Sequence, residues 1–434
     1  MIYMVDSQAY PLGDVQTWDE SLGDQVRPDL TASLTSLLPP GGASVHVFGT
    51  QPRIRDKWSG MSYLPTEPLK VDLSSMDTHE RELINAATAR FHLGMAAGRS
   101  VPKIDPRDWI AGVPSLLSMP VVDFEASSQA ECEAHLQFIK EALGPAKRLK
   151  RLWLRGQAED HAPKIPQPAQ VREWLHWGRA GASFPSLVPT LGRFALGKPG
   201  KIDSAHAARG LRHAWEKPFF LWVVRQNPQW LEGCPEFRDR LEASLRSEEE
   251  PLFDELLREM KYDPRVATEV DDLRQWFFAH YKYSAWVWVL QQYGCRASML
   301  DVTWDLDSAL FFTQGMMVDG RFALPPPQEG RVIYVFAEWR DSTVFWDDQR
   351  VDWGDADWAK HLPPRVQNQR SGCILGCTWF RQNFYGHLVV ARIWIKGDQC
   401  VTTRTIEEVF PPPEKDLLQQ TLLEARPLPE GLYF

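Results

Sequence analysis

Apolar residues recur with a helical period through the middle of this chain and form strand-like runs toward its end. The pattern from 205 to 292 is mainly helical, and we expect helix breaks at its four prolines, Pro218, Pro228, Pro251 and Pro264. After Gly330 the pattern changes to β-branched and aromatic runs at 331–336, 373–378 and 388–395. Helices followed by strands, rather than strict alternation of the two, predict an α+β fold.

The beginning of the chain differs from the rest. Short strand-like runs at 44–48 and 69–73 precede one clear helix, expected at 78–96, which opens with an acid-rich turn and ends near Gly98. No motif in this region carries recognisable chemistry. We therefore predict a small N-terminal α/β unit at 1–125, whose role would be to sense a trigger or to restrain the rest of the chain.

A second helix is expected to begin at Ser128. Ser128 and Glu131 stand in the spacing of a capping box, and Gly144-Pro145 is expected to end the helix. The basic segment 147–151 follows, and we interpret it as a solvated connector that leads into a short strand at 152–154.

Composition narrows the class of protein. The 434 residues are 44% hydrophobic and 12% aromatic, which excludes disorder along the whole chain. The net charge of −9 argues against a large polyanion-binding surface but leaves room for a local basic groove. The start of the chain lacks the signature of a signal peptide, and the longest strongly apolar run, 219–224, is too short for a bilayer. Six scattered cysteines do not make a disulfide scaffold, so we predict a cytoplasmic protein without membrane contact.

Four segments, in order along the chain, stand out for residue types that carry chemistry. They are Leu154-Arg155-Gly156-Gln157; Leu187 to Arg193; Gln292-Tyr293-Gly294 with Leu300-Asp301-Val302-Thr303 and Ala309-Leu310-Phe311-Phe312; and Arg365 to Gly372. Together these segments resemble the FRG domain family, which is named for an aromatic-Arg-Gly signature at the end of a strand. The resemblance covers about 130–420 and implies an FRG domain at 126–425, with a mixed or antiparallel β core and a large helical segment at 203–292.

Several positions depart from the family pattern. Leu154 occupies the aromatic position, and Val302 replaces a Trp, a change that affects packing. Ala297-Ser298 stands where the family has Thr-Arg, so a positive charge beside the aspartate of the third segment is missing unless Arg296 supplies it.

A strand that ends in Arg-Gly, followed by a strand that ends in a small polar residue and leads into a helix, looks like the ADP-ribosyltransferase fold. This likeness implies NAD as a substrate. Arg155 would hold the diphosphate or a ribose, because a guanidinium offers a planar and permanently charged fork. Thr303 would shape the nicotinamide pocket. Asp301 would stabilise the oxocarbenium ion that develops when the bond between nicotinamide and ribose breaks, or would orient Arg155.

In the ADP-ribosyltransferase superfamily a glutamate on a later strand completes the site, and the segment that would supply it has Gln369 here. An amide holds a ribose hydroxyl but supplies no negative charge and takes no proton. Either Asp301 does the electrostatic work, or Glu407 or Glu408 folds into the site, or the domain binds without catalysing.

Two sets of candidate residues follow from these resemblances. The catalytic candidates are Arg155, Asp301, Thr303 and Gln369, and the cofactor-binding candidates are Arg155, Gly156, Gln157, Arg193, Tyr293 and Ser298. Gly156 would let a ligand approach the backbone closely. No metal is expected, although Cys373, Cys377, His387 and Cys400 include one pair at a zinc-like spacing.

Simpler readings stand beside these. Arg155 and Asp301 could form a buried structural salt bridge. Tyr293, which replaces a His of the family, and Gly294 could be only the end of a helix. Arg193 could bind phosphate or cap a helix carbonyl.

Three functions follow from these alternatives. The first is an NAD-using ADP-ribosyltransferase or glycohydrolase that works as a toxin-like effector in bacterial anti-phage defence, with protein, nucleic acid or water as acceptor. The second is a nucleotide- or nucleic-acid-binding module without turnover. The third is an interaction scaffold.

Overall fold

The computed structural model describes a discontinuous set of residues. They are 43–48, 51–56, 62–63, 65–67, 70–71, 78–99, 120–147, 149–160, 187, 189–190, 204–226, 231–248, 250–266, 285–297, 299–318, 321–324, 330–340, 342–346, 362–375, 384–397, 400–429 and 432.

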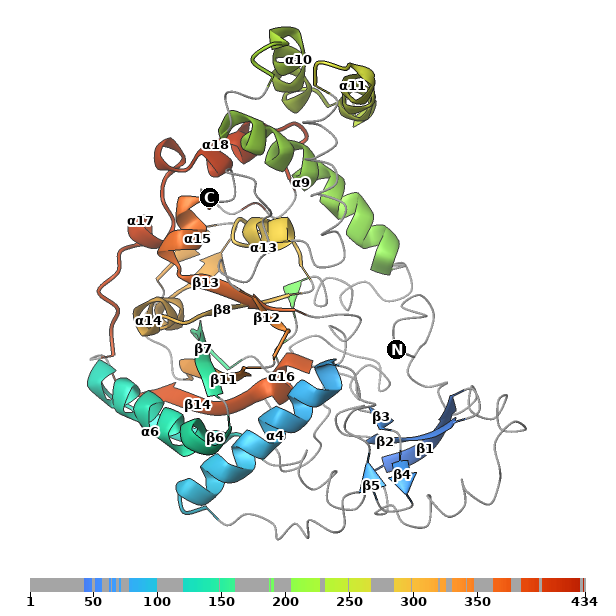
Figure 1. Cartoon of the computed structure of the whole chain (residues 1–434). Helices are drawn as coiled ribbons and strands as arrows, with labels where there is room; N and C mark the ends of the chain where they lie inside the picture. The colour runs from blue at the N-terminus through green and yellow to red at the C-terminus, as the bar shows by residue number, and fades with distance from the viewer. Residues whose placement is uncertain are drawn as a thin grey trace.

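The centre of the protein is one open seven-stranded sheet (Figure 1). Its strands, in spatial order, are β12 (Phe345–Trp346), β13 (Ser371–Ile374), β8 (Leu300–Thr303), β7 (Leu149–Gln157), β11 (Val332–Trp339), β14 (Val389–Ile395) and β6 (Val122–Ala126). Neighbouring strands are antiparallel except β14 and β6, which are parallel. The long central strands β7 and β11 pair through eight registered residue pairs, and β11 is buried along its whole length.

Helices cover this sheet and share its apolar core. They are α4 (Thr78–Ala96), α6 (Gln129–Lys147), α14 (Leu306–Gln314) and the short α16 (Phe384–Leu388). Leu93 of α4, Ile139 of α6 and Leu310 of α14 are fully buried in one cluster with residues of β7, β11 and β14. The fully buried guanidinium of Arg90 further ties α4 to the sheet, because its Nη1 donates to the carbonyl oxygens of His387 and Val389.

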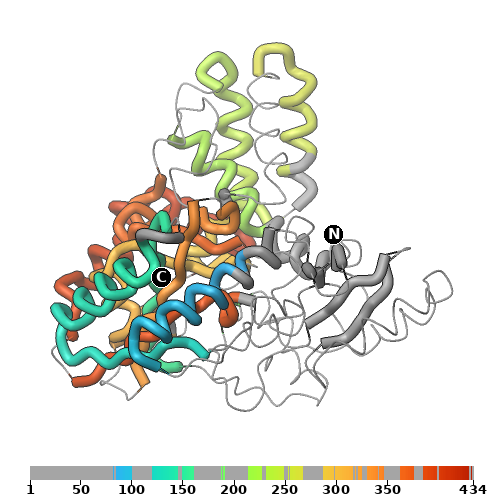
Figure 2. Tube along the Cα trace, turned by 60° about the horizontal axis from the view of Figure 1, so that its bottom comes forward, coloured from blue at the N-terminus to red at the C-terminus, as the bar shows by residue number. Residues whose placement is uncertain are grey.

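A second apolar cluster lies in the helical part of the chain. It joins α9 (Ser204–Gln226), α10 (Pro235–Leu245), α11 (Glu250–Tyr262), α13 (Ala285–Gln291) and α18 (Leu417–Glu424). In both Figure 1 and Figure 2, α10 and α11 stand away from the seven-stranded sheet. Three further short elements lie between β12 and α18 in the sequence: α15 (Pro364–Asn368), α17 (Ile406–Val409) and a 3-10 turn (Pro413–Lys415).

Three small sheets complete the described elements. β1 (Ala43–Phe48), β2 (Gln51–Asp56) and β3 (Ser62–Tyr63) form one, β4 (Pro65–Glu67) and β5 (Lys70–Val71) another, and β9 (Met316–Val318) and β10 (Arg321–Ala323) the third. The protein is thus a mixed α+β structure with one open mixed sheet, as the order of helical and strand-like patterns predicted. Within the described residues, no helix has the length and apolar character needed to span a bilayer.

Several predicted elements are confirmed. Helix α4 has the predicted bounds, and β1 and β5 lie in the strand-like runs expected near the beginning of the chain. β11, β13 and β14 each overlap a run predicted after Gly330. At Ser128 the hydroxyl accepts from the N–H of Glu131 at 3.2 Å, as expected. The Glu131 carboxylate accepts from Ser127 rather than from Ser128.

Three expected helix and strand boundaries are wrong. Pro218 does not break the helix but lies inside α9, where the buried side chains that follow it, from Phe219 to Val224, hold both parts of the helix in one apolar cluster. Gly144-Pro145 does not end α6, which continues to Lys147. The basic segment is not wholly a connector, because β7 begins at Leu149.

The basic residues of that segment gain partners from the sheet. Lys150 forms an ion pair of 3.1 Å with the buried carboxylate of Glu338, and Arg151 lies over the ring of Trp153. These contacts explain why the strand can begin in a positively charged segment, before the position at which local patterning starts it.

The sheet includes part of the predicted N-terminal unit. The boundary at 125/126 runs through β6, an edge strand of the sheet, and α4 packs into the core of that sheet. A deletion that tests the role of the chain's beginning should therefore end before Thr78, because a longer deletion removes a core helix.

Candidate functional site

The ends of β7 and β8 bring Arg155 and Asp301 together. The Nη1 of Arg155 donates to the backbone carbonyl of Asp301 at 2.8 Å and lies 4.0 Å from its Oδ2. The side chains are 22% and 36% exposed, respectively. This pair is therefore not the buried salt bridge of the structural reading, and both groups remain partly open to solvent.

Gln292 is a third member of this group that the motif analysis did not assign to the site. Its Nε2 donates to Oδ1 of Asp301 at 3.1 Å, and its backbone carbonyl accepts from Nη1 of Arg365 at 3.2 Å. Gln292 belongs to the third motif segment, directly before Tyr293, and this position was the signal in the sequence that could have assigned it to the site. We call Arg155, Gln292 and Asp301 the central polar group.

Tyr293 does not face the central polar group. Its side chain is fully buried, its hydroxyl donates to Oδ2 of Asp416 at 2.6 Å, and the guanidinium of Arg365 lies 4.4 Å from its ring centre. Burial, together with Asp416, raises the pKa of Tyr293 well above its usual value. Burial also raises the pKa of Asp416 and lowers that of Arg365. Tyr293 is thus a core residue, and the expectation that it binds a cofactor is wrong.

Gly156 contacts a helix rather than a ligand. A Cβ atom at this position would lie 1.8 Å from the carbonyl oxygen of Ala309 in α14. The close approach that requires glycine is therefore made by protein backbone, and the expected role of Gly156 in admitting a ligand stays a prediction. Gln157, the last residue of β7, is half-buried, and no hydrogen-bond partner of its Oε1 occurs in the part of the chain that the structure describes.

Thr303 and Gln369 brace the structure instead of lining an open site. The hydroxyl of Thr303 lies 2.9 Å and 3.0 Å from the carbonyl oxygens of Gln369 and Arg370, and it accepts from the N–H of Asp305. The side-chain amide of Gln369 donates to the carbonyl of Val409 at 3.3 Å. Both residues are buried, so the catalytic roles expected for them are not supported by their contacts.

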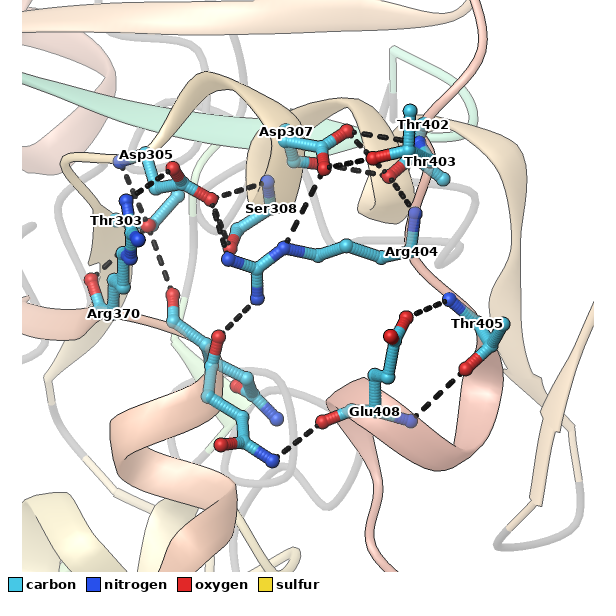
Figure 3. A network of polar contacts seen from close by, with 12 residues as sticks. Thr303, Asp305, Asp307, Ser308, Arg370, Thr402, Thr403, Arg404, Thr405 and Glu408 are labelled. Atoms are coloured by element: carbon cyan, nitrogen blue, oxygen red, sulfur yellow. Dashed lines mark hydrogen bonds and ion pairs between the residues drawn. The ribbon is translucent and has the colours of Figure 1, made fainter.

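A larger polar network lies beside Thr303 (Figure 3). Arg404 bridges Asp305 and Asp307, with its Nη2 2.9 Å from Asp305 and its Nε 3.7 Å from Asp307, and its Nη1 donates to the carbonyl of Asn368. Asp307 also accepts from the hydroxyls of Thr402 and Thr403 at 2.7 and 2.8 Å. We call Asp305, Asp307 and Arg404 the clasp, because they join the N-terminus of α14 to the segment after β14.

The clasp segment also accounts for one of the proposed substitute carboxylates. Glu408 accepts from the N–H of Thr405 at 2.7 Å while the hydroxyl of Thr405 accepts from the N–H of Glu408, a complete capping box at the start of α17 (Figure 3). Glu408 thus caps a helix and does not replace the missing glutamate. Glu407 is exposed on the same helix.

Replacing Arg404 with methionine is expected to destabilise the fold by about 1–3 kcal/mol, because two half-buried carboxylates lose their shared cation. Arg370→Met is the matched control. Arg370 is exposed, forms an ion pair of 2.9 Å with Asp305 and lies over the ring of Trp304, so its loss should cost about 1 kcal/mol. Urea denaturation of the three proteins measures the difference, and equal losses for the two variants would contradict a structural role for the clasp.

The clasp also predicts an acid-dependent loss of stability. Burial favours the neutral form of Asp307, but hydrogen bonds from Thr402 and Thr403 and the charge of Arg404 outweigh it and lower the pKa below its ordinary value of 3.8. This stabilisation is fully present at pH values above the ordinary pKa of 3.8, and it is lost as the pH falls through the lower pKa of the folded state. The stability gap between wild type and Asp307→Asn should therefore shrink as the pH falls below about 4.

Some predicted positions lie outside the described residues. These are Arg193, Ser298 and Cys377. Of the other residues of the zinc-like set, Cys400 lies with its Sγ 3.5 Å from that of Cys132, and both thiols are buried. No group of three or more His, Cys, Asp or Glu side chains that could hold a metal ion occurs in the part of the chain that the structure describes.

Comparison with known proteins finds no matching family model, no similar curated protein and no similar solved structure.

Proposed function

We propose that this chain is an FRG-domain protein that binds NAD at the central polar group and breaks its bond between nicotinamide and ribose. The observation that carries this proposal is the open Arg155–Asp301 pair, which places a cation and a carboxylate side by side at the ends of the adjacent strands β7 and β8. The fold class, an α+β protein with antiparallel central strands, agrees with the proposal.

Each member of the group has a chemical role in this reaction. Arg155 holds the diphosphate, to which a guanidinium can donate two parallel hydrogen bonds. Asp301 stabilises the positive charge on ribose C1 as nicotinamide departs with the bonding electron pair. Gln292 orients the Asp301 carboxylate through the bond at 3.1 Å. Water or a macromolecular nucleophile then attacks C1, and its proton is released to solvent. The toxin-like role in anti-phage defence belongs to the same proposal.

The test is nicotinamide release from NAD by the purified full chain, alone and with a cell lysate as a source of acceptors. Asp301→Asn should lower the rate by about 100- to 1000-fold, because it removes the charge that stabilises the transition state. Arg155→Ala should weaken NAD binding by about 10- to 100-fold, the value of one or two charged hydrogen bonds. Arg240→Ala and Glu259→Gln, which alter an exposed ion pair of α10 and α11, are the controls.

The partial exposure of Asp301 allows an effect on the reaction rate to be separated from an effect on stability. The charged atoms of Arg155 and Asp301 are 4.0 Å apart, and asparagine at position 301 keeps a side-chain oxygen that can accept from Gln292, so Asp301→Asn should change stability by no more than about 1 kcal/mol. Arg155→Ala also removes the 2.8 Å hydrogen bond to the carbonyl of Asp301 and should cost about 1–3 kcal/mol. A loss of activity with unchanged melting temperature would then report on chemistry. Absence of both nicotinamide release and NAD binding in the wild type would overturn the proposal.

A second function, nucleotide binding without turnover, is favoured by a specific observation. Thr303 and Gln369 are engaged with backbone groups, so of the four catalytic candidates only Arg155 and Asp301 are half-exposed. This alternative predicts that NAD raises the melting temperature, that Arg155→Ala abolishes the rise, and that the NAD recovered afterwards is intact.

A further inference from the structure

A row of polar side chains crosses the sheet next to the central polar group. The strand register pairs Arg155 of β7 with Tyr334 of β11, Tyr334 with Arg392 of β14, and Arg392 with Asp123 of β6. Residues paired across neighbouring strands project from the same face of a sheet. The adjacent row, on the other face, is Gly156, Ile333, Ile393 and Phe124. One face is therefore apolar at this level, and the other carries two arginines, a tyrosine and an aspartate.

Asp160, three residues after the end of β7, closes over this row. Its Oδ1 accepts from the Tyr334 hydroxyl at 2.5 Å, and its Oδ2 lies 3.6 Å from Nη1 of Arg392. Tyr334 and Arg392 are buried, whereas the Asp160 side chain is 29% exposed. A carboxylate has about four acceptor positions, so these two contacts leave Asp160 able to accept hydrogen bonds from a ligand.

Arg155 thus lies between two half-exposed carboxylates. Asp301 is on the strand to one side, and Asp160 is held above the strand on the other side. Burial and Asp160 raise the pKa of Tyr334, and the charges of Arg392 and Arg155 oppose them. Strands β8 and β11 flank β7; Asp301 belongs to β8, whereas Asp160 follows β7 and is held by its hydrogen bond to Tyr334 of β11.

Resting on the proposed function, we propose that Asp160 is the ribose-binding group of a second half-site, and that the ligand is a dinucleotide rather than a mononucleotide. In this arrangement Arg155 holds the central diphosphate. Asp301 faces the ribose whose bond breaks, and Asp160 accepts hydrogen bonds from the hydroxyls of the other ribose. A carboxylate that accepts from ribose hydroxyls is a common means of recognising the adenosine half of a dinucleotide. Tyr334 is the positioning residue that orients Asp160.

The experiment measures the affinity of the full chain for NAD, for nicotinamide mononucleotide and for NAD that lacks the 2′-hydroxyl of its adenosine ribose, by titration calorimetry. Asp160→Asn should weaken NAD binding by about 10-fold or more and leave the affinity for nicotinamide mononucleotide, which has one ribose, within about 2-fold. The deoxy analogue should bind the wild type more weakly than NAD does. Asp160→Asn should bind the analogue and NAD equally.

Asp123→Asn is the matched control. Asp123 holds the opposite side of Arg392 through bonds of 2.7 and 3.0 Å and lies outside the proposed site. If Asp160→Asn acted only by disturbing Arg392, Asp123→Asn would weaken NAD binding as much, and that result would overturn the proposal. Equal effects on NAD and on nicotinamide mononucleotide would also overturn it.

The deoxy analogue keeps the proposal testable even if Asp160→Asn fails to fold, since equal binding of NAD and the analogue by the wild type contradicts it. If the wild type binds NAD through Arg155 but shows none of these differences, the second half-site is wrong and the proposed function stands. If the wild type does not bind NAD, both fail.

Discussion

Replacing Gly156 with alanine is expected to destabilise the protein by about 3–5 kcal/mol, more than the usual cost of about 1–3 kcal/mol for an overpacked site. The added Cβ would lie 1.8 Å from the carbonyl oxygen of Ala309 and 2.8 Å from its carbonyl carbon. These are backbone atoms of α14, which cannot rotate aside as a side chain does. Either α14 or β7 must move, and because β7 is a central strand of the sheet, many packed residues must move with it.

The control for this substitution is Gly144→Ala. Gly144 lies in the last turns of α6, and nothing within 4 Å would meet an added Cβ. Alanine has a better helix propensity than glycine, so this variant should be unchanged or stabilised by up to about 1 kcal/mol. Urea denaturation midpoints compare the two variants. If Gly156→Ala proved as stable as Gly144→Ala, the close contact between β7 and α14 would be wrong.

Replacing Arg365 with alanine is expected to cost about 3–5 kcal/mol. The guanidinium is fully buried, lies 4.4 and 5.2 Å from the ring centres of Tyr293 and Phe410, and donates to the carbonyl of Gln292. Its removal leaves a cavity between two rings and takes the nearby positive charge away from the buried Asp416. Among the described residues, the Nε and Nη2 of Arg365 find no hydrogen-bond partner, so part of the expected cost is offset by relief of their desolvation.

Two further variants separate the parts of this effect. Arg365→Lys keeps a positive charge but loses the planar group that stacks on the rings, so it should be intermediate in stability. Tyr293→Phe keeps the ring and leaves the Asp416 carboxylate without the hydroxyl that it accepts from, which should cost about 1–3 kcal/mol. Thermal and urea unfolding measure these losses. A fully stable Arg365→Ala protein would show that the guanidinium does not support the core.

The same substitution has a functional consequence under the proposed reaction. Gln292 links Arg365 to Asp301, because its carbonyl accepts from Arg365 and its amide donates to Asp301. Arg365→Ala removes the bond that holds the backbone at Gln292. It should therefore lower the rate of nicotinamide release more than it weakens NAD binding, since the orientation of Asp301 matters most in the transition state.

Local patterns predicted the elements whose contacts are made by periodic apolar residues. Helix α4 was found at its full length because its acidic first turn and its glycine stop are signals within the chain. Pro218 misled the prediction because the gain from burying the residues after it, which outweighs a lost backbone hydrogen bond, depends on helices that are distant in sequence. The strand at 149–151 was missed for a related reason. Lys150 pairs with Glu338, and Arg151 lies over the ring of Trp153, only when the strand has formed.

The candidate site was predicted in part. The motif segments that carry Arg155 and Asp301 do meet, and the polar pair they form is open. Tyr293, Thr303 and Gln369 were expected to serve a ligand, but their polar atoms are used by Asp416, by backbone carbonyls and by backbone N–H groups. A motif shows which residue types are present, but it does not show which of their polar atoms are hydrogen-bonded within the protein and therefore not available to a ligand. Gln292 and Asp160 were missed for the converse reason, because their partners are 9 and 174 residues away in sequence.

The sequence by itself determined the α+β class, the principal helix near the beginning of the chain and the strands after Gly330. It did so because propensity, capping and apolar period act over a few neighbouring residues. Only the tertiary structure decided which polar side chains remain open to a ligand. That choice depends on strand register, on a helix that packs against Gly156 and on a clasp between Arg404 and α14, each of which joins residues from distant parts of the chain.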